Sequence, residues 1–324
     1  MRKVVLILFL CPIFVSSQTY QDFFTMFYNV ENMFDTIDNP KKNDNEFLPN
    51  SDKKWDTEKY NHKIQQLNRV FSLINNGDLP DVIGLCEIEN KAVINDLIDT
   101  DFFKNNNYKV IHKESEDFRG IDCALLIDTI KYDLLSFDFI EVKIPDAQRP
   151  TRDIVFARIK IKDQILNIFV NHWPSRWGGT EATEYKRVFA AQVLSDYIDN
   201  NIDDDSHVLI MGDLNDYHYN KSIKDVLVND KFVNLVISKD NDSIASYNYN
   251  NKWGYLDHMI VSKSLVDDSK LNFKDFNVFY KDWMLYEKRS GNKSPSRTYG
   301  GKTWYGGFSD HLPIFCVFNF MNKL

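Results

Sequence analysis

Short runs of apolar and β-branched residues recur along the chain, and most of them end in a polar residue suited to binding or catalysis. The run 82–86 is continuously apolar, which is typical of a strand that is covered on both faces. Residues 154–161 instead alternate apolar and polar positions, which predicts a half-buried strand. Further strands are expected over 23–30, 122–128, 165–170, 208–211, 255–261 and 312–318.

Two segments have helical periodicity. Residues 62–74 place Ile64, Leu67, Phe71 and Ile74 on one face, and residues 181–198 are predicted to bury Tyr185, Val188, Phe189 and Leu194. Strands and helices do not alternate in the regular order of a parallel doubly wound sheet. The pattern favours an α+β sandwich of antiparallel sheets with helices packed outside, formed as one domain over residues 18–324.

The N-terminus has the pattern of a signal peptide over residues 1–17. Arg2 and Lys3 precede an apolar run, and Ser16 and Ser17 offer a small-residue cleavage site. The run is too short for a stable membrane anchor, so the mature chain is expected to be secreted or periplasmic, without stable membrane insertion. Lipid anchoring at Cys11 is a minor alternative, and a buried N-terminal strand is another.

Charge and cysteine content narrow the functional classes. The formal charge of −8 becomes −10 once Arg2 and Lys3 are removed, which argues against bulk binding of polyanions. The same charge is compatible with carboxylates gathered around a metal ion. Cys86, Cys123 and Cys316 lie in apolar runs and are expected to be small core residues rather than a disulfide framework.

The polar residues that end the apolar runs form a chemically coherent set. A single residue of this kind is most often an ordinary cap or turn residue, but six strand ends offer the same oxygen and imidazole chemistry. Phosphodiester hydrolysis needs a hard cation, a base for water, a carboxylate that orients an imidazole, and donors for the charged transition state. The candidates for these roles are Asn29, Glu87, His172, Asp213, Asn215, Asp257, Asp310 and His311.

Six motifs in a fixed order carry a resemblance to a known family. They are YNVEN at 28–32, GLCEI at 84–88, NHWP at 171–174, MGDLND at 211–216, LDHMIVS at 256–262 and SDHLP at 309–313. In this order the chain resembles the endonuclease/exonuclease/phosphatase superfamily with the DNase I-like fold. The resemblance implies a four-layer α/β/β/α sandwich with two packed, mainly antiparallel sheets.

The resemblance also implies a role for each matching residue. Glu87 corresponds to the main metal ligand, with Asn29 and Asp310 as accessory ligands. Asp213 corresponds to the aspartate beside the attacking water or a second metal position, and Asn215 to the amide that orients the phosphate. His311 corresponds to the histidine at the scissile phosphate, Asp257 to its carboxylate partner, and His172 to a second histidine that contacts a phosphate oxygen. His258 departs from the family pattern and is expected to be structural.

Three further residues are candidates for substrate binding. Arg119 precedes a predicted strand where the family often has a phosphate contact, although an ordinary surface turn fits equally well. Arg176 and Trp177 follow His172 and are candidates for contacting a phosphate and stacking on a base or sugar. Asp122 is a candidate partner for His172. Residues 281–307 are locally basic in an acidic chain and contain Trp304 and Tyr305, which suits a nucleic-acid backbone as well as a solvated loop.

The leading hypothesis is therefore a secreted hydrolase, an endonuclease or another nuclease that cleaves DNA or RNA as a metal-dependent phosphodiesterase. Hard oxygen ligands favour Mg²⁺, with Mn²⁺ or Ca²⁺ as alternatives. A phosphatase or a sphingomyelinase-like phospholipase on the same fold is the first alternative, although no exposed apolar hairpin for membrane docking is evident. A non-catalytic binding protein is less consistent with the intact site. Nucleic acid is the expected partner, with no obligate protein partner evident and a monomeric state expected.

Overall fold

Two six-stranded sheets form the body of the molecule. The computed structural model describes residues 19–239, 243–266 and 270–322; the proposed signal peptide and Cys11 lie outside these residues. The first sheet contains, in spatial order, β13 (Leu271–Val278), β18 (Ile314–Asn322), β1 (Thr19–Met33), β2 (Val82–Ile88), β4 (Asp122–Asp128) and β3 (Tyr108–His112). The second contains β5 (Asp133–Ile140), β6 (Ile154–Ile161), β7 (Gln164–His172), β8 (His207–Asp213), β12 (Asp257–Ser262) and β9 (Phe232–Asn234).

Each sheet is mainly antiparallel and has one parallel pair among its described strands, β1 with β2 and β7 with β8. The carboxyl ends of parallel neighbours meet at the same edge of a sheet, so the polar residues that follow these strands are brought together. This edge carries the candidate site.

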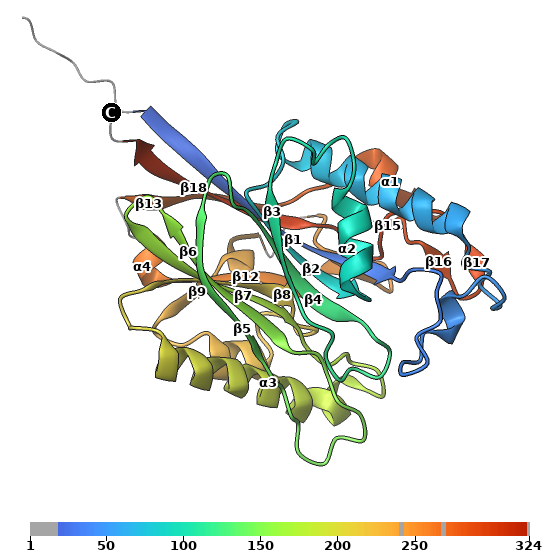
Figure 1. The fold of residues 1–324 in the computed structure, drawn as a ribbon. Coiled ribbons are helices and arrows are strands. Elements are labelled where there is room, and N and C mark those ends of the chain that lie inside the picture. Colours follow the sequence, from blue (N-terminus) through green and yellow to red (C-terminus); the bar gives the residue numbers. More distant parts are fainter. Residues whose placement is uncertain (1–18, 240–242, 267–269, 323–324) are drawn as a thin grey trace, which may run out of the picture.

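Helices cover the outer faces of both sheets (Figure 1). Helices α1 (Thr57–Ile74) and α2 (Lys91–Ile98) lie over the first sheet, and α3 (Thr180–Asn201) lies beneath the second, while α4 (Lys263–Val266) is a single turn after β12. Asp56 and Asn90 cap α1 and α2, because each side chain accepts a hydrogen bond from a backbone N–H of the first turn. The predicted four-layer α/β/β/α sandwich is confirmed.

The pleat of β8 explains how the layers hold together. Leu209 and Met211 point into the core between the two sheets, which also includes the buried face of α1. Val208 and Ile210 point the opposite way, into a second core against α3. A continuously apolar strand is therefore required at this position, as the sequence indicates.

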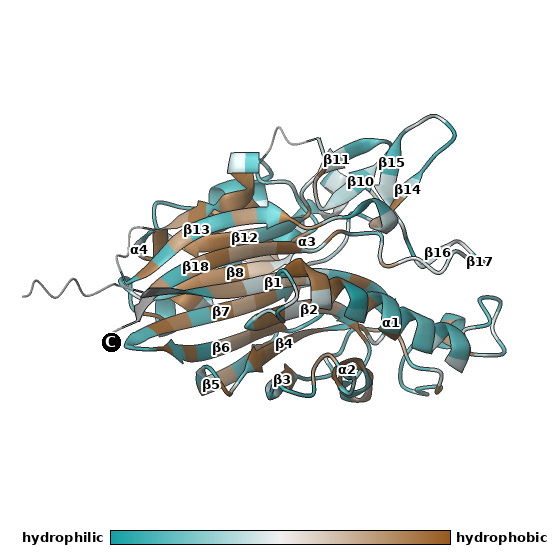
Figure 2. Cartoon of the chain, turned by 90° about the horizontal axis from the view of Figure 1, so that it is seen from above, coloured by the Kyte–Doolittle hydropathy of each residue, from teal (hydrophilic) through white to brown (hydrophobic). Residues whose placement is uncertain are grey.

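Short elements extend the sandwich at the end that carries the site. They are three hairpins, β10–β11 (Tyr247–Tyr249, Lys252–Gly254), β14–β15 (Leu285–Glu287, Lys293–Pro295) and β16–β17 (Tyr299–Gly300, Thr303–Trp304). Four short helical segments complete the chain: η1 (Asn45–Phe47), η2 (Ser222–Leu227), which packs against α3, η3 (Leu235–Lys239) and η4 (Asp282–Met284). Figure 2 shows these hairpins as a mostly hydrophilic group beyond the brown strands of the sheets. The basic segment 281–307 thus contains η4 and two of these hairpins, and is not a loop without regular structure.

One prediction about side-chain burial is wrong. Tyr185 is 51% exposed, whereas Ala190, Ala191 and Leu194 of α3 are buried. The helix faces its sheet with small side chains and the buried Arg187, so its contact face lacks the large apolar stripe that periodicity detects. In α1, all four predicted core residues are buried, and Cys86, Cys123 and Cys316 are free buried thiols as expected. No helix among the described residues is long and apolar enough to cross a membrane.

Candidate functional site

Strand register places three of the predicted residues next to one another in the second sheet. His172 at the end of β7 is the pairing partner of Asp213 at the end of the parallel strand β8. Asp257 at the start of the antiparallel strand β12 is the partner of the same Asp213 on its other side. Asp213 therefore lies between the other two because of backbone pairing alone, and all three side chains are buried.

Asn29 joins the first sheet to this row. It ends the regular part of β1, and its Nδ2 donates to Asp213 Oδ2 at 3.0 Å and lies 3.4 Å from Glu87 Oε1. Glu87 has a left-handed backbone (φ 64°) at the irregular end of β2, and its Oε2 accepts a hydrogen bond from the backbone N–H of Asn32. Its side chain is 14% exposed, so this carboxylate remains open to solvent.

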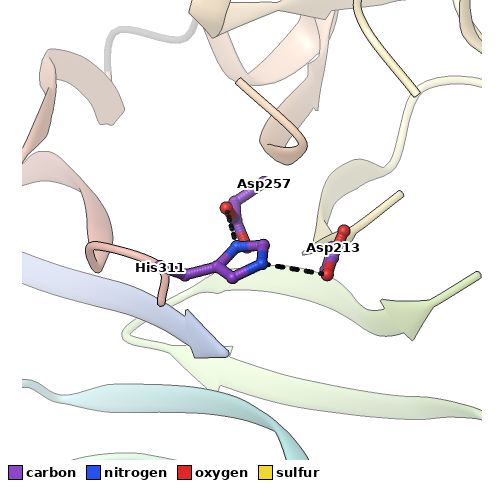
Figure 3. A group of neighbouring side chains, drawn as sticks. All are labelled: Asp213, Asp257 and His311. Carbon is purple, nitrogen blue, oxygen red and sulfur yellow. Dashed lines mark hydrogen bonds and ion pairs between the residues drawn. The ribbon is translucent and has the colours of Figure 1, made fainter. Parts of the chain in front are cut away.

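His311 is held by two carboxylates (Figure 3). Its Nδ1 donates to Asp257 Oδ2 at 2.7 Å, and its Nε2 lies 3.8 Å from Asp213 Oδ2. Burial lowers the pKa of His311, but the charges of Asp257 and Asp213 outweigh burial and hold this pKa well above its ordinary value. The protonated form of the imidazole is therefore favoured, and the ring is fixed in orientation with Nε2 facing Asp213.

His172 has the opposite electrostatic environment. Its Nε2 lies 3.8 Å from Asp213 Oδ2 and 4.0 Å from Glu87 Oε1. Burial and the nearby charge of Arg152 hold its pKa well below the ordinary histidine value, so this ring is neutral. The predicted partner Asp122 instead accepts hydrogen bonds from the backbone and hydroxyl of Ser115. Within the described residues, Nδ1 of His172 has no hydrogen-bond partner.

Asn215 is held beside the row by backbone contacts. It has a left-handed conformation (φ 53°), its N–H donates to Asp213 Oδ1, and its Nδ2 donates to the carbonyl of Trp173. One amide hydrogen of Asn215 satisfies that carbonyl, and a side-chain amide has a second one to offer. Burial raises the pKa of Asp213 to about 7, against the opposing charge of His311.

The donor set fits a hard divalent cation. Ligand atoms of Asp213, Asp257 and His311 lie within 4.8 Å of one another, but a protonated His311 has no lone pair for a metal. The open carboxylate of Glu87 is linked to Asp213 through Asn29. Carboxylate oxygens are the ligands that Mg²⁺ and Ca²⁺ prefer. Oδ2 of Asp257 is already engaged with His311, which leaves Glu87, Asp213 and the outer Asp310 as the carboxylates for a cation.

Asp310 lies at the outer side of this group. Its Oδ2 accepts a hydrogen bond from Arg297 at 2.9 Å, and Arg297 also contacts Glu31. The three predicted metal ligands are therefore not equivalent in the structure, since Glu87 contacts Asn29 whereas Asp310 pairs with an arginine.

Sequence reasoning missed a buried pair of charges behind Asp310. Glu31 accepts from the backbone N–H of Thr298, and Lys63 of α1 donates to the Thr298 hydroxyl and to the carbonyl of Phe308. Burial raises the pKa of Glu31 to about 7 and lowers that of Lys63 to about 8. A signal was available, because Lys63 lies four residues before Leu67 and so falls on the buried face of α1.

The three predicted substrate-binding residues differ in their surroundings. Trp177 is 88% exposed, and Arg119 is half-exposed with its Nε 3.8 Å from Asp117. Arg176 is engaged by protein groups, since it donates to the Asn215 carbonyl at 2.7 Å and to Asp216 at 3.1 Å. The contacts of Arg176 thus support the loop that carries Asn215. For all three residues, a contact with substrate stays a prediction.

Asp216 anchors this loop to α3. The Nε of Arg187 lies 2.8 Å from Asp216 Oδ2, and both side chains are completely buried. Ser222 donates to the same oxygen, and His258 donates to the Asp216 carbonyl, so His258 is structural as expected.

We expect Arg187→Leu to lower the free energy of unfolding by about 3–5 kcal/mol, because it leaves the Asp216 carboxylate buried without its main counter-charge. Urea denaturation followed by circular dichroism measures this change. Lys231→Met is the matched control, since Lys231 pairs with Asp199 and Asp204 at the surface and its loss is expected to change stability little. Equal effects of the two substitutions would contradict the anchoring role of Arg187.

Comparisons with known proteins bear on the family and the fold of the chain. The model of the Endonuclease/Exonuclease/phosphatase family matches residues 25–320. A humanized D. rerio TDP2 structure superposes with a TM-score of 0.61 at 15% identity, covering 93% of this chain and 99% of that one. A search of curated proteins gives no match.

Two Bacteroides thetaiotaomicron structures are also similar. An endonuclease/exonuclease/phosphatase family protein gives a TM-score of 0.57 at 14% identity, covering 94% of this chain and 97% of that one. A mannosyl-6-phosphatase gives 0.55 at 15% identity, covering 91% and 98%. Identities this low support the fold alone, whereas the family model spans nearly all of the described residues. The chain therefore belongs to the endonuclease/exonuclease/phosphatase family, as its six ordered motifs predict.

Proposed function

We propose that the chain hydrolyses phosphodiester bonds with the help of a divalent cation, Mg²⁺ in the first instance, and that its substrate is a nucleic acid. The observation that carries this proposal is the continuous contact from Asp257 through His311 to Asp213, with Glu87 beside it. Carboxylates, an oriented imidazole and amide donors are the groups that attack on a phosphate requires.

Glu87 would hold the cation in this proposal. Asn29 donates through Nδ2 to Glu87 and Asp213, so an accessory ligand role would fall to its Oδ1, which now accepts from the Glu31 backbone N–H. Arg297 contacts one carboxylate oxygen of Asp310, and the other is assigned the second accessory role. A bound cation neutralises the phosphate charge and increases the acidity of a coordinated water.

Asp213 is placed to accept the proton of the attacking water. It lies between the two histidines, and its Oδ1 is fixed by the backbone of Asn215. The water oxygen bonds to phosphorus as its proton passes to the Asp213 carboxylate. The bond from phosphorus to the leaving oxygen breaks, and that oxygen takes the Nε2 proton of the His311 ring and departs as an alcohol. Asp257 keeps the His311 ring oriented throughout, as a carboxylate does for a catalytic imidazole.

The remaining polar groups stabilise the charge that develops on the phosphate oxygens. His311 offers the N–H of a cationic ring, and His172 offers a neutral ring at the same edge. Asn215 offers its second amide hydrogen. Such donors are effective because they are already oriented before the reaction begins.

The nucleic-acid part of the proposal is supported by two observations. The segment 281–307 is basic and borders Asp310, and a similar D. rerio TDP2 structure is described as complexed with single strand DNA product, at 15% identity and a TM-score of 0.59. The mannosyl-6-phosphatase among the similar structures makes phosphate monoester hydrolysis the second candidate.

Initial rates on matched substrates test the proposal. We expect the purified chain with Mg²⁺ to hydrolyse bis(p-nitrophenyl) phosphate and single-stranded DNA or RNA faster than p-nitrophenyl phosphate, mannose 6-phosphate or sphingomyelin. A strong preference for either monoester would contradict a phosphodiesterase, and a preference for sphingomyelin would contradict a nuclease.

A further inference from the structure

A cavity of about 560 Å³ opens beside the candidate site. Its walls include Tyr247 and Asn248 of β10, Tyr286 of β14, Tyr305 and Asp310. This volume lies within the range of about 300–1,000 Å³ that holds a single small-molecule-sized group. One nucleoside fits such a space, whereas a base-paired duplex does not.

The cavity is joined directly to the catalytic histidine. The ring of Tyr247 lies against that of His311, with ring centroids 4.7 Å apart. The two residues also pair through their backbones, and Leu312 donates to the Ser246 carbonyl. Asp310 lies on the cavity wall. The cavity is therefore next to the place where a phosphate would bind, and a group attached to that phosphate can enter it.

Two exposed phenol rings offer stacking surfaces in the cavity. Tyr286 is 58% exposed and Tyr305 is 63% exposed; Tyr286 belongs to β14, and Tyr305 directly follows β17. Tyr305 lies closely over Gly300, because a Cβ at that glycine would come within 2.4 Å of the tyrosine ring. Glycine therefore permits the ring to lie against the backbone, which holds it in a fixed position.

Asn248 adds an unsatisfied amide to the same wall. Its side-chain oxygen and nitrogen are both buried, and neither has a hydrogen-bond partner among the described residues. Both atoms are covered in this structure, so a ligand reaches them only after the side chain turns toward the cavity. An amide without partners costs on the order of 1–3 kcal/mol, which favours that turn when a bound group satisfies it. An amide offers one acceptor and two donors, which matches the mixed donor and acceptor edge of a nucleobase.

The charge of the neighbouring surface is suited to a nucleic-acid backbone. Lys288 and Arg297 line the cavity, and Lys288 donates to Asn251 at 2.8 Å, which links the β14–β15 segment to the β10–β11 hairpin. The two hairpins lie side by side at this end of the molecule (Figure 2). A lipid chain would need a continuous apolar lining, and lysine, serine and asparagine interrupt this one.

We propose that this cavity is a subsite for one unstacked nucleobase next to the scissile phosphate, read by Tyr286, Tyr305 and Asn248. The inference rests on the proposed function and sharpens its substrate class. A base reaches the cavity only when it is free of its duplex partner, so the enzyme acts on single-stranded nucleic acid or on unpaired ends. Stacking on tyrosine tolerates any base, which gives strand selectivity without a defined sequence.

The test compares a single-stranded oligonucleotide, its duplex, and a strand of the same length built from abasic residues. We expect wild-type protein to cleave the single strand with a kcat/KM about 5- to 100-fold higher than that on the abasic strand, the factor carried by one base–aromatic stack. The duplex is expected to be cleaved more slowly than the single strand. In Tyr286→Ala and Tyr305→Ala the preference over the abasic strand is expected to fall toward unity.

Tyr249→Ala is the matched control, because Tyr249 is an exposed tyrosine of the neighbouring β10–β11 hairpin that does not line the cavity. It is expected to keep the wild-type preference. Asn248→Leu, which removes the unpaired amide without emptying its volume, is expected to raise KM for the single strand with little change in kcat.

The outcomes separate the two proposals. Hydrolysis of bis(p-nitrophenyl) phosphate with no cleavage of any oligonucleotide overturns the base subsite while leaving phosphodiester chemistry intact. Equal cleavage of normal and abasic strands by wild-type protein, or an unchanged preference in both tyrosine variants, also overturns it. Absence of any phosphodiester hydrolysis contradicts the proposed function itself.

Discussion

Replacing His311 with alanine is expected to lower kcat on a phosphodiester by about 10²- to 10⁴-fold, the range that a positioned proton-transfer or donor group contributes. The reason is geometric. His311 lies between two carboxylates: its Nδ1 contacts Asp257 at 2.7 Å, and its Nε2 lies 3.8 Å from Asp213, the carboxylate proposed to receive the water proton. Steady-state kinetics on bis(p-nitrophenyl) phosphate measure the loss.

His218→Ala is the control for this prediction, since His218 follows the Asp213–Asp216 loop and lines a different cavity. It is expected to retain near wild-type kcat. Thermal melting of both variants separates catalysis from folding. A His311→Ala protein that melts like the wild type and keeps its kcat would show that the histidine has been misassigned.

Replacing Glu87 with glutamine is expected to lower kcat/KM by about 10²-fold or more and to raise the Mg²⁺ concentration needed for half-maximal activity. Glutamine preserves the shape and removes a negative charge that is open to solvent and is not paired with an arginine, unlike that of Asp310. A loss of this size is typical when a group that stabilises transition-state charge is removed. Metal titrations of initial rate measure both effects.

Glu89→Gln is the matched control two residues away. Burial raises the pKa of Glu89 to about 8, so this carboxyl is largely protonated at neutral pH and glutamine resembles it closely. Its oxygen accepts a hydrogen bond from the Asp35 backbone, a contact that glutamine keeps. If both variants lose activity equally, the effect belongs to the local fold and the assignment of Glu87 as the metal ligand fails.

The main strands and the grouping of the site residues could be predicted from the sequence because their causes are local. Continuous apolar runs predict the strands β2 and β8. A polar residue at the end of each run must then lie at the edge of the sheet. His172, Asp213 and Asp257 meet because adjacent strands pair in register, and the motif order already implies that adjacency.

Other features depend on contacts between distant segments. The hairpins β10–β11, β14–β15 and β16–β17 are two or three residues per strand and mostly polar, so no periodicity reveals them. Arg176 was predicted as a phosphate contact, yet its hydrogen bonds to Asn215 and Asp216 depend on how two loops meet. The unsatisfied amide of Asn248 is likewise visible only when its surroundings are known.

The most direct test of the central claim is the initial rate of bis(p-nitrophenyl) phosphate hydrolysis by protein treated with EDTA, before and after Mg²⁺ is restored. The carboxylates of Glu87 and Asp213 need a cation to approach a phosphate without repulsion. We predict that activity is lost on chelation and returns with Mg²⁺ in the wild-type protein. Full activity in the presence of excess EDTA would contradict the account.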